Sequence, residues 1–595
     1  MAVKALLGPD PGPASRGGGD GGNALDFGLR RTEDVHIEVT PSMAAEFTAD
    51  EQKRLAPFFT NLDRSTFGLK LPQEVAGALF SRYSRSTKSL RRTFLDEFLG
   101  DPALGLSDLL GGQAEPSDDS TALKKARAFY ERVLVGYGDD SVAQLGGAHI
   151  ACENISNVAA KLLEDARIGI APLEKSTRYV RFDQKDSAGN YLFYREPKIM
   201  ASRHRDAYVE VMNLLFETYS RQMEPMLHFV SKSLPIEQLE VRDPSSGKSL
   251  TYDDARKDDR LRRWAETAYR ATVRAHACDV LRSYLPAATL TNVGLFGVGQ
   301  AFEYLLSKFY SHPLSEAKAL AAAMHTDLNQ LIPSFVKRAQ LNEFLVNATL
   351  AAKALANNSI TAAPRISNEP VTLIDYDAQA EEKIVAGILY SHARHPLAQL
   401  REVAAAMSQE QRRKILEDHF GKRRHRRDKL SRAFENVYYT FDILGNLGLY
   451  RDLHRHRILT QERQDFTTVH GYDTPPEIEE AGFTSKFANC MKRAAELYED
   501  IYRDLPSEAQ YVVPFAYKIR WYMKMNLREA VHMCELRTMP QGHPDYRFIC
   551  QEMWRKIQQV HPTLAESGKF MDWEKYRLGR LQSEMRTEYK KSAFE

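Results

Sequence analysis

The chain repeats part of its own sequence, and this duplication limits its possible folds more than any other feature. The segment VAGALFSRYSRSTKSL, Val75 to Leu90, returns as VAGILYSHARHPLAQL, Val385 to Leu400. Val, Ala, Gly, Leu and Ser recur in register, and Phe80 is matched by Tyr390. Such self-similarity indicates that one structural unit has been copied. We therefore expect the 595 residues to form two related units.

Two further pairs of segments extend the duplication. AHIACENISNVAAKLLEDARIG near residue 150 and ENVYYTFDILGNLGLYRDLHRHR near residue 440 each predict a strand leading into a long helix. The alternation of Val437, Tyr439 and Phe441 with polar residues has the period of a strand. Downstream, the segments from Leu285 and from Val512 each place a proline before a strand and an amphipathic helix. These pairs predict a first unit at about 45–365 and a second at about 366–595.

The remaining segments predict the fold class. Helical periodicity dominates, as in residues 316–337, so we expect an α+β, helix-rich protein in which each copy has a small sheet packed by helices. Residues 110–122 predict a loop, and 357–370 a linker between the copies. Residues 236–260 are dense in Pro, Ser, Gly and Asp, which predicts an exposed insertion. Residues 1–44 are expected to be a disordered Gly/Pro-rich tail.

Composition gives no sign of a membrane or polyanion partner for the whole chain. The net charge is +2, and no apolar run approaches the roughly 20 residues of a membrane helix. The start of the chain does not resemble a secretory signal. The five cysteines have no CxxC spacing, so we expect small buried residues in a reduced, cytoplasmic protein.

A dense polar motif points to function. HRHRILTQERQDF, residues 454–466, lies between apolar segments. Arg455, His456 and Arg457, with Thr460 after them, resemble the opening of the signature RHRxxSxNExSxRY of the flavin-dependent thymidylate synthases. The preceding run from Phe434-Glu435 is also similar to that family. The end of the signature is missing here, because other residues replace SxRY: Asp465, Thr467 and Thr468.

The first copy has the converse pattern. In EKSTRYVRF, the residues matching E-x-S-x-R-Y are Glu174, Ser176, Arg178 and Tyr179. The RHR positions are lost, being Ala166, Arg167 and Ile168.

The C-terminal helices differ in the same way between the two copies. NLREAVHMCELR resembles the C-terminal helix of the family, with Asn526 at a flavin-contacting position and Arg537 at a nucleotide-binding position. The first copy has Gly297 and Lys308 instead. The losses in the two copies are complementary, which predicts one composite site built from both.

The resemblance implies an activity and its partners. The family methylates C5 of dUMP to give dTMP, using FAD, NADPH and methylenetetrahydrofolate, at sites between the subunits of a homotetramer. A duplicated chain would then be a homodimer. The implied catalytic residues are Ser176, Arg178 and Arg537, and the substrate would also contact Glu174 and Tyr179. The implied cofactor-binding residues are Arg455, His456, Arg457 and Asn526. No metal is expected.

Other interpretations of the same residues stay open. Arg455 to Arg457 could be the cationic end of a helix, and Arg178 could be a paired structural arginine. A degenerate homologue could bind nucleotide or flavin without turnover. The run KRRHRRDK, Lys422 to Lys429, could bind RNA or form a solvated surface. The histidine spacing gives no carboxylate-supported metal site.

Overall fold

The computed structural model describes residues 46–71, 73–84, 86–99, 144–360 and 369–592. The chain divides into two compact units: the first holds residues 1–149, 296–307 and 323–340, and the second holds 150–295, 308–322 and 341–595. Segments of both sequence copies pack within the second unit, so these units do not follow the boundary between the copies. The predicted tail at 1–44, the loop at 110–122 and most of the linker at 357–370 lie outside the described residues.

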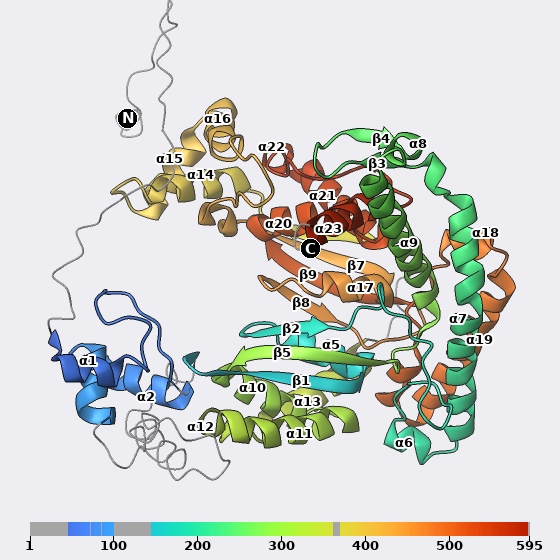
Figure 1. Cartoon of the computed structure of the whole chain (residues 1–595), viewed down its shortest axis with the longest axis horizontal. Helices are drawn as coiled ribbons and strands as arrows, with labels where there is room; N and C mark the ends of the chain where they lie inside the picture. The colour runs from blue at the N-terminus through green and yellow to red at the C-terminus, as the bar shows by residue number, and fades with distance from the viewer. Residues whose placement is uncertain (1–45, 72, 85, 100–143, 361–368, 593–595) are drawn as a thin grey trace, which may run out of the picture. The chain divides into compact units, whose positions relative to one another are not determined.

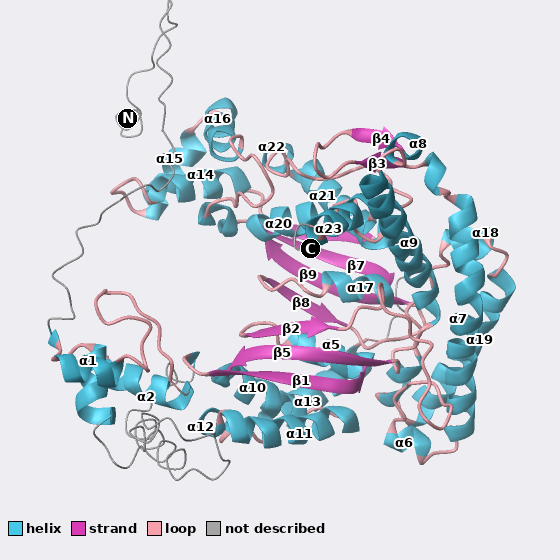
Figure 2. Cartoon of the chain, in the orientation of Figure 1, coloured by secondary structure: helices cyan, strands magenta, loops and turns pink. Residues whose placement is uncertain are grey.

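Two sheets carry the duplication, and both are magenta in Figure 2. One has the order β1-β5-β2 and the other β6-β7-β9-β8. In both sheets the latest strand along the chain lies between two earlier ones: β5 between β1 and β2, and β9 between β7 and β8. The two sheets share this three-strand arrangement, and the second sheet has β6 as an additional edge strand. In the second sheet, β7 and β9 pair antiparallel from Tyr438↔Asn526 to Asn446↔Lys518. The strand bounds are β1 Gly147–Ser156, β2 Ile170–Glu174, β5 Leu290–Val298, β6 Val371–Tyr376, β7 Tyr438–Asn446, β8 Leu459–Arg463 and β9 Lys518–Asn526.

A helix directly follows β1 and β5 in the first copy and β7 and β9 in the second, as the sequence predicts. The last strand residue often caps the helix: Asn446 accepts from the Leu449 N–H, and Asn526 from the Glu529 N–H. Such caps satisfy N–H groups that have no partner inside the helix. The helices after β1 and β7 are shorter than expected, with 9 and 7 residues. These four helices are α5 Asn157–Asp165, α10 Gly299–Tyr310, α17 Leu447–Leu453 and α20 Leu527–Arg537.

Long helices pack beside the sheets in the second unit. The α7 helix packs against α9 and α19, and its apolar face buries residues such as Tyr208 and Phe216. Among the described residues, no helix is both long enough and apolar enough to cross a membrane. The five cysteines are free and buried, as expected. The helices are α7 Arg205–Ser233, α9 Asp259–Leu281, α19 Thr484–Asp504, α21 Pro544–Val560 and α23 Leu581–Lys591.

Shorter helices complete the described structure (Figure 1). The duplicated VAG segments form α2 and α14, so this pair is helical in both copies. The predicted helical run at 316–337 forms α11 and α12. The bounds are α1 Ala49–Leu55, α2 Gln73–Tyr83, α3 Leu90–Thr93, α6 Pro197–Met200, α8 Tyr252–Ala255, α11 Ser315–Leu331, α12 Pro333–Val336, α13 Glu343–Ser359, α14 Ala380–Tyr390, α15 Leu397–Ala406, α16 Gln409–Phe420, α18 Pro476–Glu480 and α22 Pro562–Ala565.

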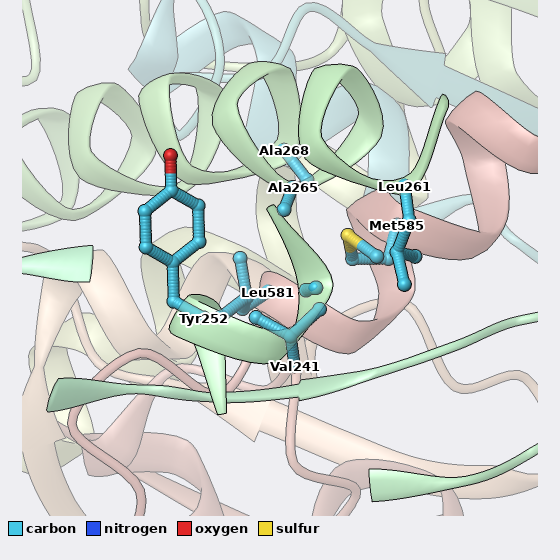
Figure 3. Close-up of a cluster of buried hydrophobic side chains, with 8 residues drawn as sticks. Val241, Tyr252, Leu261, Ala265, Ala268, Leu581 and Met585 are labelled. Carbon is cyan, nitrogen blue, oxygen red and sulfur yellow. The ribbon is translucent and has the colours of Figure 1, made fainter. Parts of the chain in front are cut away.

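The predicted insertion at 236–260 is not a plain exposed loop. It forms a hairpin of β3 (Glu240–Arg242) and β4 (Ser249–Thr251), followed by α8. Val241 and Met585 are fully buried in a cluster that joins the hairpin to α9 and α23 (Figure 3). Residues 243–247, which are part of the polar run that suggested exposure, lie in the turn between the two strands, while Val241 and Tyr252 belong to this core.

The two copies meet at equivalent prolines inside the second unit. Pro286 precedes β5 and Pro514 precedes β9, and the two residues form an antiparallel bridge. The neighbouring backbone groups exchange hydrogen bonds: Ala287 N–H donates to Val513, and Phe515 N–H donates to Leu285. The pairing therefore connects matching points of the two copies.

Candidate active site

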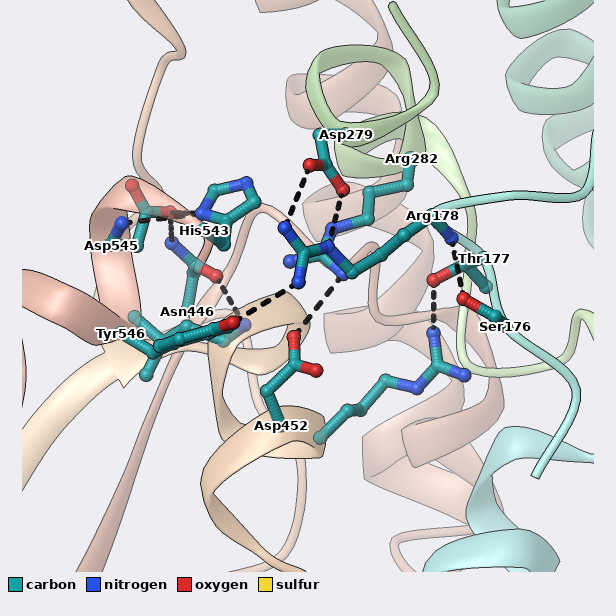
Figure 4. A network of polar contacts seen from close by, with 12 residues as sticks. Ser176, Thr177, Arg178, Asp279, Arg282, Asn446, Asp452, His543, Asp545 and Tyr546 are labelled. Atoms are coloured by element: carbon teal, nitrogen blue, oxygen red, sulfur yellow. Dashed lines mark hydrogen bonds and ion pairs between the residues drawn. The ribbon is translucent and has the colours of Figure 1, made fainter. Parts of the chain in front are cut away.

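Arg178 is held by two other elements of the second unit. Its Nε and NH2 donate to the two carboxylate oxygens of Asp279 on α9, at 2.9 and 3.1 Å. Its NH1 donates to the Tyr546 hydroxyl on α21, at 3.1 Å (Figure 4). Burial alone would raise the pKa of Asp279, but Arg178 and Arg580 outweigh it and hold that pKa far below its usual range. Asp279 is therefore an ionised anchor for Arg178.

Tyr546 connects the two predicted arginines. The Arg178 guanidinium carbon lies 5.6 Å from the centre of the Tyr546 ring, and that of Arg537 lies 5.8 Å from it. Both distances are in the range of cation–π contacts. Arg178 comes from the first copy and Arg537 from the second. The structure thus brings together residues that the sequence assigned to one composite site.

His456 is buried between a carboxyl and a guanidinium. Its Nδ1 lies 2.7 Å from Glu529 Oε1, and Arg537 Nε donates to its Nε2 at 3.0 Å. Because Arg537 can only donate, His456 carries its proton on Nδ1. Burial, with Arg537 and other nearby cations, lowers the pKa of His456 well below its usual value, so the ring is neutral. Burial also raises the pKa of Glu529 to about 7.

A metal-like cluster occurs at the same place. Ligand atoms of His456, Glu529 and His532 all lie within 4.8 Å of one another. The donor set does not fit a cation, because His456 would need a bare Nδ1 and a protonated Nε2, whereas Arg537 donates to Nε2. Lys429 Nζ also lies 2.6 Å from His532 Nδ1. Glu529 and His532 lie three residues apart on α20, a local spacing that the sequence analysis did not single out, and only His456 joins them through the fold.

Glu174 lies in a buried ion network rather than facing open space. Its carboxylate accepts from Arg451 NH2 at 2.6 Å and from Lys161 Nζ at 2.9 Å. Arg451 also donates to Thr177 Oγ1 at 2.8 Å. These contacts tie the motif of the first copy to α17, the helix that leads to Arg455 in the second copy. Both carboxylate oxygens of Glu174, for which the sequence suggests a substrate contact, accept hydrogen bonds within this network.

A second set of contacts fixes the RHR segment. Arg167 NH1 donates to the His456 carbonyl at 2.8 Å and to Gln461 Oε1 at 2.9 Å. His454 Nε2 lies 2.7 Å from Asp165. Arg167 stands at a position where the first copy lost its RHR. The residue that replaced the motif there thus holds the surviving motif in place.

The remaining predicted residues differ in accessibility. Arg455 and Arg457 are exposed, and Tyr179 is 52% exposed. Ser176 Oγ accepts from the Arg178 N–H at 3.2 Å, which shapes the turn. Asn526 is buried, with its side-chain oxygen used as the α20 cap.

A cavity of about 260 Å³ opens beside Arg178. Its wall includes Asp279 and Arg282 from the first copy and Asn446 from the second, whose amide donates to Asp473 and Asp545 at 3.0 and 2.8 Å (Figure 4). None of the predicted site residues lines it. Tyr546 and this cavity were missed because no local motif marks them.

The basic run Lys422 to Lys429 is only partly a solvated surface. Arg423 is buried and donates to both oxygens of Glu535, at 2.9 and 2.6 Å. Asp428 accepts from the backbone N–H groups of Arg424 and His425. The run thus contains structural groups, and its remaining exposed cations are fewer than the sequence suggests.

Comparisons with known proteins identify the family of the chain. The family model described as thymidylate synthase complementing protein matches residues 106–334 and 372–563. The chain therefore belongs to that family and matches its model in two tandem segments. This confirms the family resemblance and the duplicated, helix-rich α+β architecture.

Individual relatives are similar over different lengths. A UPF0159 protein of Chlamydia pneumoniae is 40% identical over 91% of this chain and 98% of its own length. A flavin-dependent thymidylate synthase of Geobacter sulfurreducens is 30% identical over 22% of this chain and 61% of its own. A crystal structure of a UMP/dUMP methylase from Streptomyces cacaoi covers 34% of this chain and 94% of that chain, with 18% identity and a TM-score of 0.26. That last likeness is too low to carry an argument.

Proposed function

We propose that the chain methylates C5 of a uracil nucleotide, converting dUMP to dTMP, with FAD as cofactor and with NADPH and methylenetetrahydrofolate as co-substrates. The observation that carries the proposal is the convergence of Arg178 and Arg537, from different copies, on Tyr546. Family membership supports it, because the matched model is named for thymidylate synthase complementation.

Arg178 and Arg537 are proposed to bind the nucleotide. Planar guanidinium groups give bidentate, charge-assisted hydrogen bonds to phosphate. Asp279 and Tyr546 fix the orientation of Arg178. Ser176 and the backbone N–H groups of its turn would stabilise charge on the uracil carbonyls. Tyr179 is accessible and can contact the same nucleotide.

The flavin is proposed to lie against the RHR segment. FAD, when bound, would supply the reducing equivalents for methyl formation. Arg455 and Arg457 are exposed residues, and their guanidinium groups would suit its phosphates. His456 is occupied by Glu529 and Arg537, so it would act by holding Arg537 in place. Asn526 has its oxygen committed to the α20 cap and could offer its NH2 group.

The proposal also covers assembly and location. Two duplicated chains would supply four units, so we propose a homodimer in the cytoplasm. A nucleotide-binding homologue without turnover is the second candidate, because Arg178 is already paired with Asp279 at short distance. Methyl transfer separates the two candidates.

The first test is an absorbance titration of the purified full chain with FAD, before and after dUMP. We expect a bound-flavin spectrum that shifts when dUMP is added. Methyl transfer from labelled methylenetetrahydrofolate with NADPH should then yield dTMP. Flavin and dUMP binding without dTMP would favour the non-catalytic homologue. Absence of flavin binding under all conditions would contradict the proposal.

A further inference from the structure

The segment after the family match covers the candidate phosphate site. The match ends at residue 563, and the described chain continues to 592. We name residues 570–580 the C-terminal strap. Arg547 on α21 donates to the Asp572 side chain at 2.9 Å and to the Glu574 carbonyl at 3.0 Å. The strap is thus bound to the helix that also carries Tyr546.

The strap ends in a buried arginine. Arg580 is 6% exposed, and its NH2 donates to Asp279 Oδ2 at 2.6 Å. Arg178 NH2 donates to the same oxygen at 3.1 Å. The Arg580 guanidinium carbon also lies 4.9 Å from the centre of the Tyr179 ring. Arg580 therefore contacts or adjoins three members of the candidate site: Arg178, Asp279 and Tyr179.

One nitrogen of the Arg580 guanidinium has no hydrogen-bond acceptor within the described part of the chain. Its NH1 is buried and has no hydrogen-bond partner among the described residues. An unsatisfied buried donor is costly, and a native one requires an explanation such as a missing water or ion. Arg580, Arg178 and Arg577 line one recess of about 30 Å³, which shares His276, Asp279 and Pro544 with the larger cavity. The recess has room for the oxygens of an anion but not for a whole nucleotide.

The arrangement of charged groups around Arg580 also favours an anion at this place. Arg178, Arg282 and Arg580 surround two carboxylates, Asp279 and Asp452. Among these ion-paired groups the guanidinium groups outnumber the carboxylates, while Asp473, Glu477 and Asp545 line the adjoining larger cavity. A phosphate oxygen would supply the acceptor that the buried N–H of Arg580 lacks.

We propose that Arg580, delivered by the C-terminal strap, is a second phosphate-binding arginine that acts with Arg178. This inference rests on the proposed function for the identity of the ligand, a nucleoside monophosphate. It assigns part of the substrate site to a segment beyond the family match.

The test compares dUMP with deoxyuridine in titration calorimetry of the full-length protein. Arg580→Gln should weaken dUMP binding roughly 10- to 100-fold, the range for a lost charge-assisted contact, and leave deoxyuridine binding unchanged. Arg580→Lys, which keeps the charge but loses the planar fork, should give a smaller loss. Arg586→Gln removes an exposed arginine from α23 and should bind dUMP like the wild type.

A second readout separates this inference from the proposed function. At matched ionic strength, inorganic phosphate in place of chloride should raise the Tm of the wild type and of Arg586→Gln, but not of Arg580→Gln. If wild type fails to bind dUMP yet shows this phosphate effect, the proposed function fails and the anion site stands. Equal phosphate effects in Arg580→Gln and wild type, or no effect in wild type, would overturn the inference and leave a water-filled recess. Should Arg580→Gln not fold, Arg580→Lys decides: a phosphate effect on Tm smaller than that of the wild type supports the inference, and an undiminished effect overturns it.

Discussion

At the scale of single residues, the important partners are ones that no motif announces. The sequence predicts Arg178 and Arg537 as site residues, but it contains no local sign that Asp279 holds Arg178 or that Tyr546 lies against both arginines. Those partners lie on α9 and α21, more than 100 positions from Arg178 along the chain. The two arginines could therefore be predicted from their place in a motif. The residues that contact them could not, because those contacts depend on tertiary packing.

Tyr546→Phe should weaken dUMP binding roughly 3- to 10-fold, because it removes one hydrogen-bond acceptor and keeps the ring. Calorimetry of the full chain measures this loss. Tyr502→Phe, at a 49% exposed position, is the matched control. Unchanged affinity in Tyr546→Phe would show that the hydroxyl does not orient Arg178 for substrate.

Glu529 predicts a definite dependence of stability on pH. Its pKa is about 7 in the folded protein against an ordinary value of 4.5. Between these two pH values the folded state keeps a proton that the unfolded state has released. The contribution of Glu529 to the free energy of unfolding therefore falls as pH rises from 4.5 to about 7, and it is constant above that pH. Each unit of pKa corresponds to about 1.4 kcal/mol.

Glu529→Gln cannot ionise and should lose that part of the pH dependence. Relative to wild type, the free energy of unfolding of the variant should therefore increase from pH 5 to pH 8. Urea denaturation at several pH values measures it, with Glu499→Gln, at an exposed position, as control. Parallel profiles for wild type and Glu529→Gln would contradict the raised pKa.

At the scale of elements, the duplicated strand–helix pairs were predictable because hydrophobic period and repetition are local signals. Register was harder to assign. The bridged Pro286 and Pro514 are 228 positions apart in the sequence. If the same offset relates the two copies downstream, the residue equivalent to Asn526 is Val298, whereas the sequence comparison places Gly297 there. The hairpin at 240–251 was missed because its apolar side chains pack on α23, some 340 positions away.

Met585→Ala tests that packing. Met585 is fully buried among Val241, Leu261 and their neighbours, so truncation should cost about 2–5 kcal/mol of unfolding free energy. Chemical denaturation measures the loss, and Arg586→Ala at the next, exposed position should change stability little. If Met585→Ala lowered the free energy of unfolding no more than Arg586→Ala does, the packing of α23 against the hairpin would not depend on this core.

At the scale of the whole molecule, the two copies contribute different residues to the one candidate site that we propose. Arg178 of the first copy bonds to Tyr546 of the second within the same chain, and Arg451 of the second bonds to Glu174 of the first. The complementary loss predicted from sequence is therefore matched by contacts. The sequence could not say whether the halves meet within a chain, because that depends on how the copies pack.

Mixing two inactive variants tests this arrangement. Arg178→Ala and Arg457→Ala should each abolish dTMP formation, and mixtures of the two should stay inactive because both residues serve the same chain. Light scattering should give twice the chain mass of 67.7 kDa if the proposed dimer forms. Recovered activity in mixtures that have exchanged subunits would instead place the site across two chains.

The proline bridge between the copies has a consequence for how such a protein can evolve. In a symmetric homo-oligomer every substitution appears on both sides of an isologous contact, so neither side can change alone. Here Pro286 and Pro514 are encoded separately, and each neighbourhood can accept mutations that the other does not share. In a fused chain the two halves can therefore mutate independently, and one half could come to support the site residues of the other.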